Sequence, residues 1–203
     1  HFTELIRPDG ALIVHTGLEL KPRVAEGVKV YTYSKTEGDF HASNIRKGDG
    51  EIIFDFVTPW ETVSDIKLGV PVDINIENAL AAMAACRLVQ ISVEAMREAI
   101  GSFMGAKRRF EFWLKEPGEN GKVVIDDYAH HPNEIAASIK SVRDLYPGRK
   151  ITAVFQPHLY TRTRDFADEF AQSLSHADEV ILLPIYPARE LPIEGVSSEI
   201  ILK

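Results

Sequence analysis

The stretch VVIDDYAHHPNEI, residues 123–135, joins an apolar run to a polar loop and then to a proline. The apolar run predicts a buried strand. Pro132 suits the first position of a helix, because the N–H that proline lacks would have no partner there. Apolar residues continue at helical spacing from Ile135 to Tyr146, and Pro147 then ends the helix. The stretch therefore predicts a strand, a loop and a helix in succession.

The same order of elements recurs in the residues that follow. Residues 151–155 are an apolar strand, and the stretch FQPHLYTRTRDF (155–166) leads into a helix with a stripe of Phe166, Phe170 and Leu174. Residues 179–183 predict a further strand, and residues 110–126 predict two strands around a turn-rich connection. This alternation predicts an α/β domain with a Rossmann-like parallel sheet, whose ligands gather beyond the carboxyl ends of the strands.

The first half of the chain has a different pattern. Ala11–His15 and Val28–Tyr33 are short apolar runs typical of strands, and residues 41–57 predict a hairpin that turns at Lys47-Gly48-Asp49-Gly50. An alanine-rich helix is expected over residues 75–89, and Ser92 can cap the next helix. The change of pattern at the loop 105–109 predicts two domains, residues 1–108 and 109–203.

The composition is that of a globular protein, with 45% hydrophobic and 26% charged residues. A net charge of −7 argues against a sequence-independent nucleic-acid surface, which requires a field of Lys and Arg. An anionic substrate would need local positive clusters. Lys107-Arg108-Arg109 and Arg162-x-Arg164 are the two candidates, and each could equally be a solvated helix end or loop.

The cellular compartment is indicated by cysteine usage and by the lack of targeting patterns. Cys86 is the only cysteine, so no intramolecular disulfide can form, and its alanine-rich surroundings favour a buried, unreactive thiol. No apolar span approaches membrane length, and no signal-peptide pattern opens the chain. We therefore expect a cytoplasmic protein without a membrane or nucleic-acid partner.

The loop from Asp126 to Glu134 concentrates two carboxylates, a phenol and two imidazoles after a strand. A metal site is one interpretation, but neighbours in an extended segment point in opposite directions, so His130 and His131 cannot easily hold one ion. An acid/base site is a second interpretation, because His and Asp titrate at useful pH values. In the third, His131 caps the helix and Asp126 binds backbone.

The loop from Gln156 to Arg164 is the second polar connection. Its arginines offer planar donors that suit a carboxylate or phosphate, and a helix that begins near Thr163 would add backbone donors. An anion site is therefore reasonable. The alternative is that Thr163 is a helix cap and both arginines are solvated.

Four motifs together resemble the Mur ligase family. The two stretches 123–135 and 155–166 look like the motif pair of its last domain, and GAKRRFE (105–111) and NALAAMAA (78–85) fit the same family in the same order. The motif residues are most similar to those of the alanine-adding members. The resemblance covers essentially the whole chain: residues 1–108 resemble the later part of a central ATPase domain, and residues 109–203 most of the carboxy-terminal domain.

The resemblance implies two groups of ligand-binding residues. The group on the ATP side, which would contact the adenine, the phosphates and the ribose, is Asn75, Asn78, Arg109, Asp127 and Tyr128. The group on the amino-acid and muramyl side is His130, His158 and Arg162. The implied substrates are UDP-N-acetylmuramate, L-alanine and ATP with Mg²⁺, which are joined in peptidoglycan precursor synthesis through an acyl phosphate. No metal ligand is assigned to this chain, because the family's Mg²⁺ ligands are expected upstream.

Two positions depart from the family pattern. Ile74 stands where many members have His, and Leu159 stands where many have Arg. The second departure removes part of the expected carboxylate-binding set. Arg162 or Arg164 could compensate for it, which we treat as a hypothesis.

The phosphate-binding loop is the largest departure. No G-x-x-x-x-G-K-[ST] motif occurs in the 203 residues, and Gly118-Glu119-Asn120-Gly121-Lys122 is too short and lacks the hydroxyl. We therefore expect the chain to be a fragment that is inactive by itself. A nucleotide-binding regulatory module without ligase chemistry and a scaffold protein are the alternatives, and coding sequence upstream with a phosphate loop would favour the ligase over both.

Overall fold

The computed structural model describes residues 2–19, 21–118 and 120–202. It divides into two compact units. The first comprises residues 1–47 and 51–104, and the second comprises residues 48–50 and 105–203. The division after Met104 lies next to the loop in which the sequence pattern changes.

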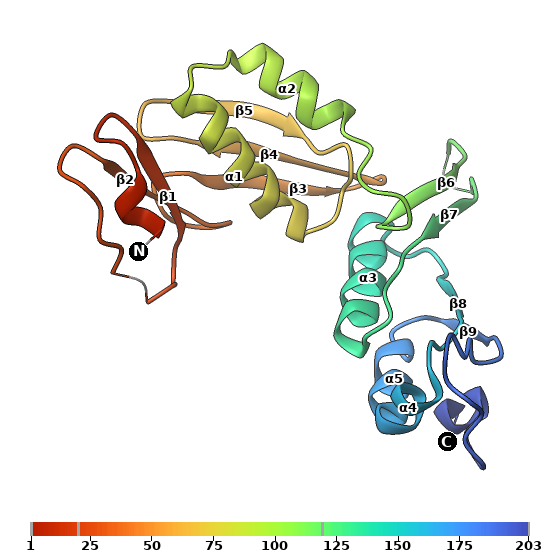
Figure 1. Ribbon diagram of the computed structural model, residues 1–203. Coiled ribbons are helices and arrows are strands. Elements are labelled where there is room, and N and C mark those ends of the chain that lie inside the picture. The colour runs from red at the N-terminus through yellow and green to blue at the C-terminus, as the bar shows by residue number, and fades with distance from the viewer. Residues whose placement is uncertain (1, 20, 119, 203) are drawn as a thin grey trace. The chain divides into compact units, whose positions relative to one another are not determined.

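The first unit contains two small sheets. After the 3-10 helix η1 (Phe2–Leu5), strands β1 (Ala11–His15) and β2 (Lys29–Tyr33) pair in parallel, Ala11 opposite Lys29. Strands β3 (His41–Gly48), β4 (Glu51–Val57) and β5 (Thr62–Lys67) form the second sheet in that order. Helix α1 runs across this sheet with α2 beside it (Figure 1).

The turn between β3 and β4 confirms the predicted hairpin. Asp49 and Gly50 both have positive φ, 52° and 72°, which is the conformation of a two-residue turn whose twist matches that of the strands. Ile52, Phe54 and Phe56 alternate along β4 and are buried. The pattern of strand and turn residues in this region was therefore sufficient to predict the structure.

Helices α1 (Ile74–Leu88) and α2 (Val93–Ser102) also agree with the sequence prediction. Ser92 caps α2, because its hydroxyl accepts a hydrogen bond from the Ala95 N–H at 3.2 Å. Cys86 is only partly buried, so the expectation of a buried thiol was wrong. The reason is local: Cys86 lies beside an open cavity rather than inside the packed core.

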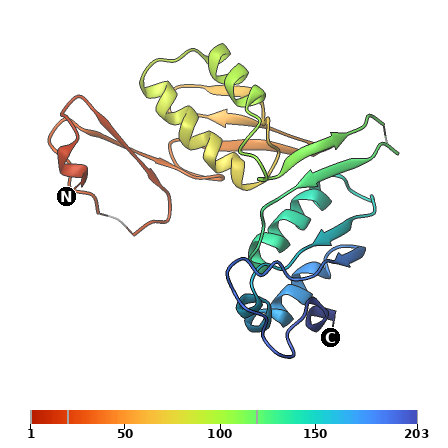
Figure 2. The same cartoon turned by 45° about the vertical axis from the view of Figure 1, so that its right-hand side comes forward.

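The second unit begins with strands β6 (Glu111–Lys115) and β7 (Val123–Asp126), which pair antiparallel. Helix α3 (Pro132–Leu145) begins at the predicted proline and is followed by β8 (Thr152–Phe155). Helices α4 (Tyr160–Asp165) and α5 (Ala167–Leu174), strand β9 (Glu179–Leu182) and the 3-10 helix η2 (Ser198–Leu202) complete the unit. Helix α5 packs against α3 and η2 (Figure 2).

The α/β class is that predicted, with two differences in detail. Among the described residues of this unit, parallel pairing joins only β8 and β9, with Thr152 opposite Glu179. The helix expected to begin near Thr163 begins instead at Tyr160 and is interrupted at Phe166, where φ and ψ are −125° and 25°. Thr163 therefore lies inside a helix and is not its cap.

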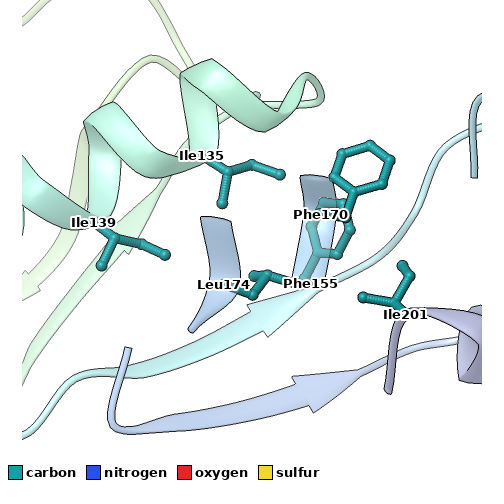
Figure 3. Close-up of a cluster of buried hydrophobic side chains, with 6 residues drawn as sticks. All are labelled: Ile135, Ile139, Phe155, Phe170, Leu174 and Ile201. Carbon is teal, nitrogen blue, oxygen red and sulfur yellow. The ribbon is translucent and has the colours of Figure 1, made fainter. Parts of the chain in front are cut away.

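A compact apolar cluster forms the core of the second unit (Figure 3). Phe155 comes from β8, Ile201 from η2, and the remaining members lie on the facing sides of α3 and α5, which are Ile135, Ile139, Phe170 and Leu174. The Phe155 and Phe170 rings are tilted against each other at 5.3 Å. Helical stripes that the sequence predicted separately thus meet in one cluster.

No helix in the described part of the chain is long and apolar enough to cross a membrane.

Phe170 should be a principal contributor to the stability of this unit. Only 1% of its surface is exposed, so Phe170→Ala leaves a cavity and should lower the free energy of unfolding by about 3–5 kcal/mol. Leu191→Ala is the matched control, because Leu191 is 85% exposed and its truncation should change stability by less than about 0.5 kcal/mol. Urea denaturation of the two variants measures the difference, and equal effects would contradict the assigned core.

Candidate functional site

Two polar loops of the second unit follow strands β7 and β8, as the sequence pattern predicted. The first runs from Asp127 to His131 and the second from Gln156 to Leu159. All the candidate residues of this unit except the arginines lie in these loops. The side-chain contacts of each loop show which residues are held in place and which are free to bind a ligand.

Asp127 is fixed by its own neighbours. One carboxylate oxygen accepts a hydrogen bond from the Ala129 N–H at 3.1 Å, and the other accepts one from the Ser138 hydroxyl at 2.5 Å. The first contact closes a short turn after β7, and the second ties that turn to α3. Asp127 is therefore oriented by the fold, while its partly exposed carboxylate retains further acceptor positions.

Tyr128 lies between a guanidinium and an imidazole. The Arg108 guanidinium is 5.0 Å from the Tyr128 ring centroid, and the His130 ring is 5.2 Å away on a tilted plane. Arg108 also pairs with Asp126 at 3.5 Å. The sequence prediction singled out Arg109, but it is the preceding arginine that contacts Tyr128. The Arg109 side chain is exposed, and no partner for its guanidinium occurs among the described residues.

His130 and His131 contact different groups, as expected for neighbours in an extended segment. His130 Nδ1 is 3.0 Å from the Tyr128 carbonyl oxygen, whereas the His131 ring packs edge-on against Phe166 at 5.2 Å. Both backbone N–H groups donate to the Glu134 carboxylate, at 3.0 and 3.2 Å. The N–H of His130 in particular holds the pKa of Glu134 below its ordinary value of 4.5. The carboxylate thus fixes the start of α3.

His158 lies in the second loop and is stacked on Tyr186, with ring centroids 5.5 Å apart and planes inclined by 24°. Burial and the charges of Arg162 and His130 lower the pKa of His158 from its ordinary value of 6.5, while Glu190 acts in the opposite direction. His158 is therefore neutral at pH 7, and its ring can donate one hydrogen bond and accept another.

Leu159 connects His158 to helix α4 in an uncommon conformation, with φ of 73° and ψ of 135°. Such backbone strain in a residue with a side chain costs on the order of 1–3 kcal/mol and persists only where the surroundings impose it. Here the Leu159 N–H donates to the Tyr186 carbonyl at 2.9 Å, and its own carbonyl accepts from the Thr163 hydroxyl at 2.7 Å. Hydrogen bonds therefore hold the Leu159 backbone at both its N–H and its carbonyl.

Arg162 and Arg164 differ in what they can bind. The Arg164 guanidinium is about half exposed and pairs with Asp165 at 2.8 Å. The Nη1 atom of Arg162 is buried and has no hydrogen-bond partner among the described residues. A buried donor without a partner is costly unless a ligand or water completes it. The geometry thus favours Arg162 over Arg164 as the residue that compensates for the missing arginine at position 159.

His158 is influenced by two other basic residues. Arg162 and His130 both act electrostatically on His158, although the first lies on α4 and the second follows β7. We call His130, His158 and Arg162 the basic cluster. Two imidazoles and a guanidinium with an unpaired donor are suited to a small carboxylate. The resemblance placed these residues in one site, and the charges of Arg162 and His130 are among the causes that lower the pKa of His158.

The remaining candidates, Asn75 and Asn78, belong to the first unit. Asn75 donates to the Val70 carbonyl at 3.1 Å, and Asn78 donates to the Asn75 side-chain oxygen at 3.1 Å. Both line a cavity of about 390 Å³ between α1 and α2, together with Met83, Cys86 and other largely apolar residues. The volume and the two amides suit a planar heterocycle. Ile74, one residue earlier, is 59% exposed.

No group of three or more His, Cys, Asp or Glu side chains suited to a metal ion occurs within residues 2–19, 21–118 and 120–202.

Sequence reasoning missed three residues that organise the site, Arg108, Glu134 and Glu190. Arg108 stood within the basic run that the charge pattern identified. Glu134 stood in the loop already under consideration, three residues after the N-cap, which is a recognised capping position. Glu190 accepts from the Thr161 N–H and hydroxyl at 3.0 and 2.5 Å, and nothing in the sequence indicated a contact across so many residues.

The sequence of the chain is similar to those of several known proteins. Residues 108–203 match the family model described as "Mur ligase, glutamate ligase domain". The chain is 58% identical over 201 residues to a UDP-N-acetylmuramate–L-alanine ligase of Phocaeicola vulgatus, covering 98% of this chain and 43% of that protein. It is 50% identical to a Porphyromonas gingivalis protein of the same name, covering 100% and 44%. The chain thus spans less than half the length of these curated relatives.

Solved structures are also similar to this chain. A UDP-N-acetylmuramate–alanine ligase from Thermotoga maritima superposes with a TM-score of 0.65 at 29% identity, covering 77% of this chain and 34% of that one. A folylpolyglutamate synthase from the same organism has a TM-score of 0.64 at 22% identity, covering 82% and 37%. The second likeness shows a shared fold only.

The Glu134 cap provides a test of the first loop. Because its pKa is lowered in the folded state, its carboxylate stabilises the fold above the ordinary value of 4.5, and this contribution is lost as the pH falls through the folded value. Glu134→Gln keeps an acceptor but removes the charge. We expect it to be less stable than wild type at pH 7, with the difference shrinking below pH 4.5.

Chemical denaturation across this pH range measures the effect, with the exposed helix residue Glu98 as the control in Glu98→Gln. A destabilisation by Glu134→Gln that did not vary with pH would show that the charge does not act at the start of α3.

Proposed function

The chain belongs to the Mur ligase family, and we propose that it is part of an ATP-dependent ligase that joins L-alanine to UDP-N-acetylmuramate in peptidoglycan precursor synthesis. The observation that carries the proposal is the basic cluster, in which the buried Nη1 of Arg162 has no partner. High identity to the alanine-adding relatives over nearly the full chain supports it.

In the proposed reaction, the muramyl carboxylate attacks the γ-phosphorus of ATP and ADP leaves, giving an acyl phosphate. The alanine amine then attacks the acyl carbon, phosphate leaves, and an amide bond forms. Such phosphoryl transfer depends chiefly on positioning and on charge stabilisation, to which Mg²⁺ and a phosphate-binding loop contribute. Neither is assigned to this chain, so its residues serve binding and alignment.

The basic cluster would bind the carboxylate of L-alanine. Arg162 offers a charged donor in a half-buried setting, where water is excluded and a charge-assisted hydrogen bond is strong. Neutral His158 can donate a second hydrogen bond, and the stacking on Tyr186 fixes its ring plane. Holding the carboxylate at two points would direct the amine of the same molecule toward the acyl phosphate.

The proposed ATP-side residues belong to both units, and the role of each unit is proposed separately. Asn75 and Asn78 would face the adenine through the cavity between α1 and α2. Arg109, whose guanidinium has no partner among the described residues, would reach the phosphates, and Asp127 and Tyr128 would contact the ribose. Cytoplasmic localisation follows from where such nucleotide precursors are consumed and is part of the same proposal.

Arg162 provides the test of the amino-acid side in the full-length enzyme. We expect Arg162→Ala to raise KM for L-alanine at least about tenfold, or ~1.4 kcal/mol, with a smaller change for ATP. Arg164→Ala is the matched control and should behave as wild type, because Arg164 is exposed and paired with Asp165. Steady-state phosphate release gives both constants. Equal changes for alanine and ATP would show that Arg162 serves the fold and not the amino acid.

The 203-residue chain by itself should have no ligase activity and no measurable ATP affinity. Hydrogen bonds from two asparagines contribute only about 0.5–1.5 kcal/mol each, whereas a Kd of ~0.1 mM requires about 5.5 kcal/mol. Calorimetry at millimolar ATP should therefore detect no binding. Phosphate release that required both the muramyl substrate and L-alanine would overturn the expectation, and it would also exclude a regulatory module without ligase chemistry.

A further inference from the structure

The segment after β9 continues the pairing of β8 with β9 beyond the ends of both strands. Leu183 N–H donates to Phe155 O at 2.9 Å, Tyr186 N–H donates to Pro157 O at 2.8 Å, and Leu159 N–H donates to Tyr186 O at 2.9 Å. His158 and Tyr186 form an isolated parallel bridge, shifted by one residue from the register of β8 with β9. The backbone around His158 is therefore paired with the segment 183–190 through Leu183 and Tyr186.

Glu190, at the end of that segment, replaces a missing helix cap. The N-cap position of α4 is Leu159, whose side chain cannot accept a hydrogen bond. The Glu190 carboxylate accepts instead from the N–H and the hydroxyl of Thr161. The same contacts, with the Thr161 hydroxyl as the largest influence, lower the pKa of Glu190, so the carboxylate is charged at neutral pH.

We propose that Glu190 and Tyr186 are positioning residues of the basic cluster: Glu190 fixes the first turn of α4, which carries Arg162, and Tyr186 fixes the ring of His158. The proposal deepens the function proposed above and depends on it only for the identity of the ligand. Neither residue needs to touch the amino acid, since each acts through a neighbour that does.

The position of the segment 183–190 affects both Arg162 and His158. Arg162 lies one residue after Thr161, so a shift of the first turn of α4 moves its guanidinium directly. Tyr186 is 53% exposed, so packing in a core does not explain its stacking on His158. The segment 183–190 thus contacts both the loop that carries His158 and the helix that carries Arg162.

The kinetic test uses the full-length enzyme. We expect Glu190→Ala to raise KM for L-alanine at least about tenfold while KM for ATP stays within about twofold, and Glu190→Gln to retain part of the alanine affinity because its amide oxygen can still accept from Thr161. Glu194→Ala, which removes an exposed carboxylate four residues after Glu190, is the control and should match wild type. An unchanged KM for alanine, or equal rises for alanine and ATP, would overturn the proposal.

A second readout does not depend on activity. The charged groups that act on His158 are Arg162 of α4, His130 after β7 and Glu190 itself, and only Glu190 raises its pKa. In the 203-residue chain, Glu190→Gln should move the NMR titration of His158 to lower pH, whereas Glu194→Gln should leave it in place. The His158 resonance is assigned by its loss in His158→Gln.

The two readouts separate failure of the positioning role from failure of the proposed function. An unchanged His158 titration in Glu190→Gln would overturn the positioning role whatever the kinetics show. A shifted titration in a protein whose full-length form does not use L-alanine would retain the positioning role and reject the alanine ligase. If Glu190→Ala fails to fold, Glu190→Gln decides both measurements.

Discussion

The backbone pairing between the loop after β8 and the segment after β9 is the constraint on which the second unit's polar site depends. Parallel strands place their carboxyl ends at one edge of a sheet, but the loops beyond them are normally free to diverge. Here the hydrogen bonds of Leu159 and Tyr186 keep the two connections together after the strands have ended. The strained conformation of Leu159 is maintained by the same bonds, so the path of the loop and the conformation of Leu159 have one cause.

The sequence was sufficient for elements whose signals are local. The Asp49-Gly50 turn, the Ser92 cap and the start of α3 at Pro132 each depend on residues within a few positions of one another. Strand β5 was not predicted, because its buried residues Val63 and Ile66 are three apart and not two. Positive φ at Asp65 and a register shift in the pairing with β4 break the usual alternation of a strand.

The site was harder to predict than the fold. Which side chains meet there depends on the local backbone conformation and on contacts with residues that are distant in the sequence. Adjacent arginines cannot be distinguished by composition, and Arg108 contacts Tyr128 in a segment where its own φ is 59°. The carboxylate of Glu190 meets Thr161 only after β9 has returned the chain to that edge of the sheet. The fold itself does not distinguish substrates: a folylpolyglutamate synthase shares it at 22% identity. Discrimination must therefore lie in the loops.

Leu159 shows how such discrimination can change during evolution. Its backbone is fixed by hydrogen bonds from its own N–H and to its own carbonyl, and neither involves the side chain. An exchange between leucine and arginine at this position therefore alters the charge beside the basic cluster while the loop keeps its path. Glycine would relax the strained conformation. The backbone path and the side-chain chemistry at position 159 can therefore change independently of each other.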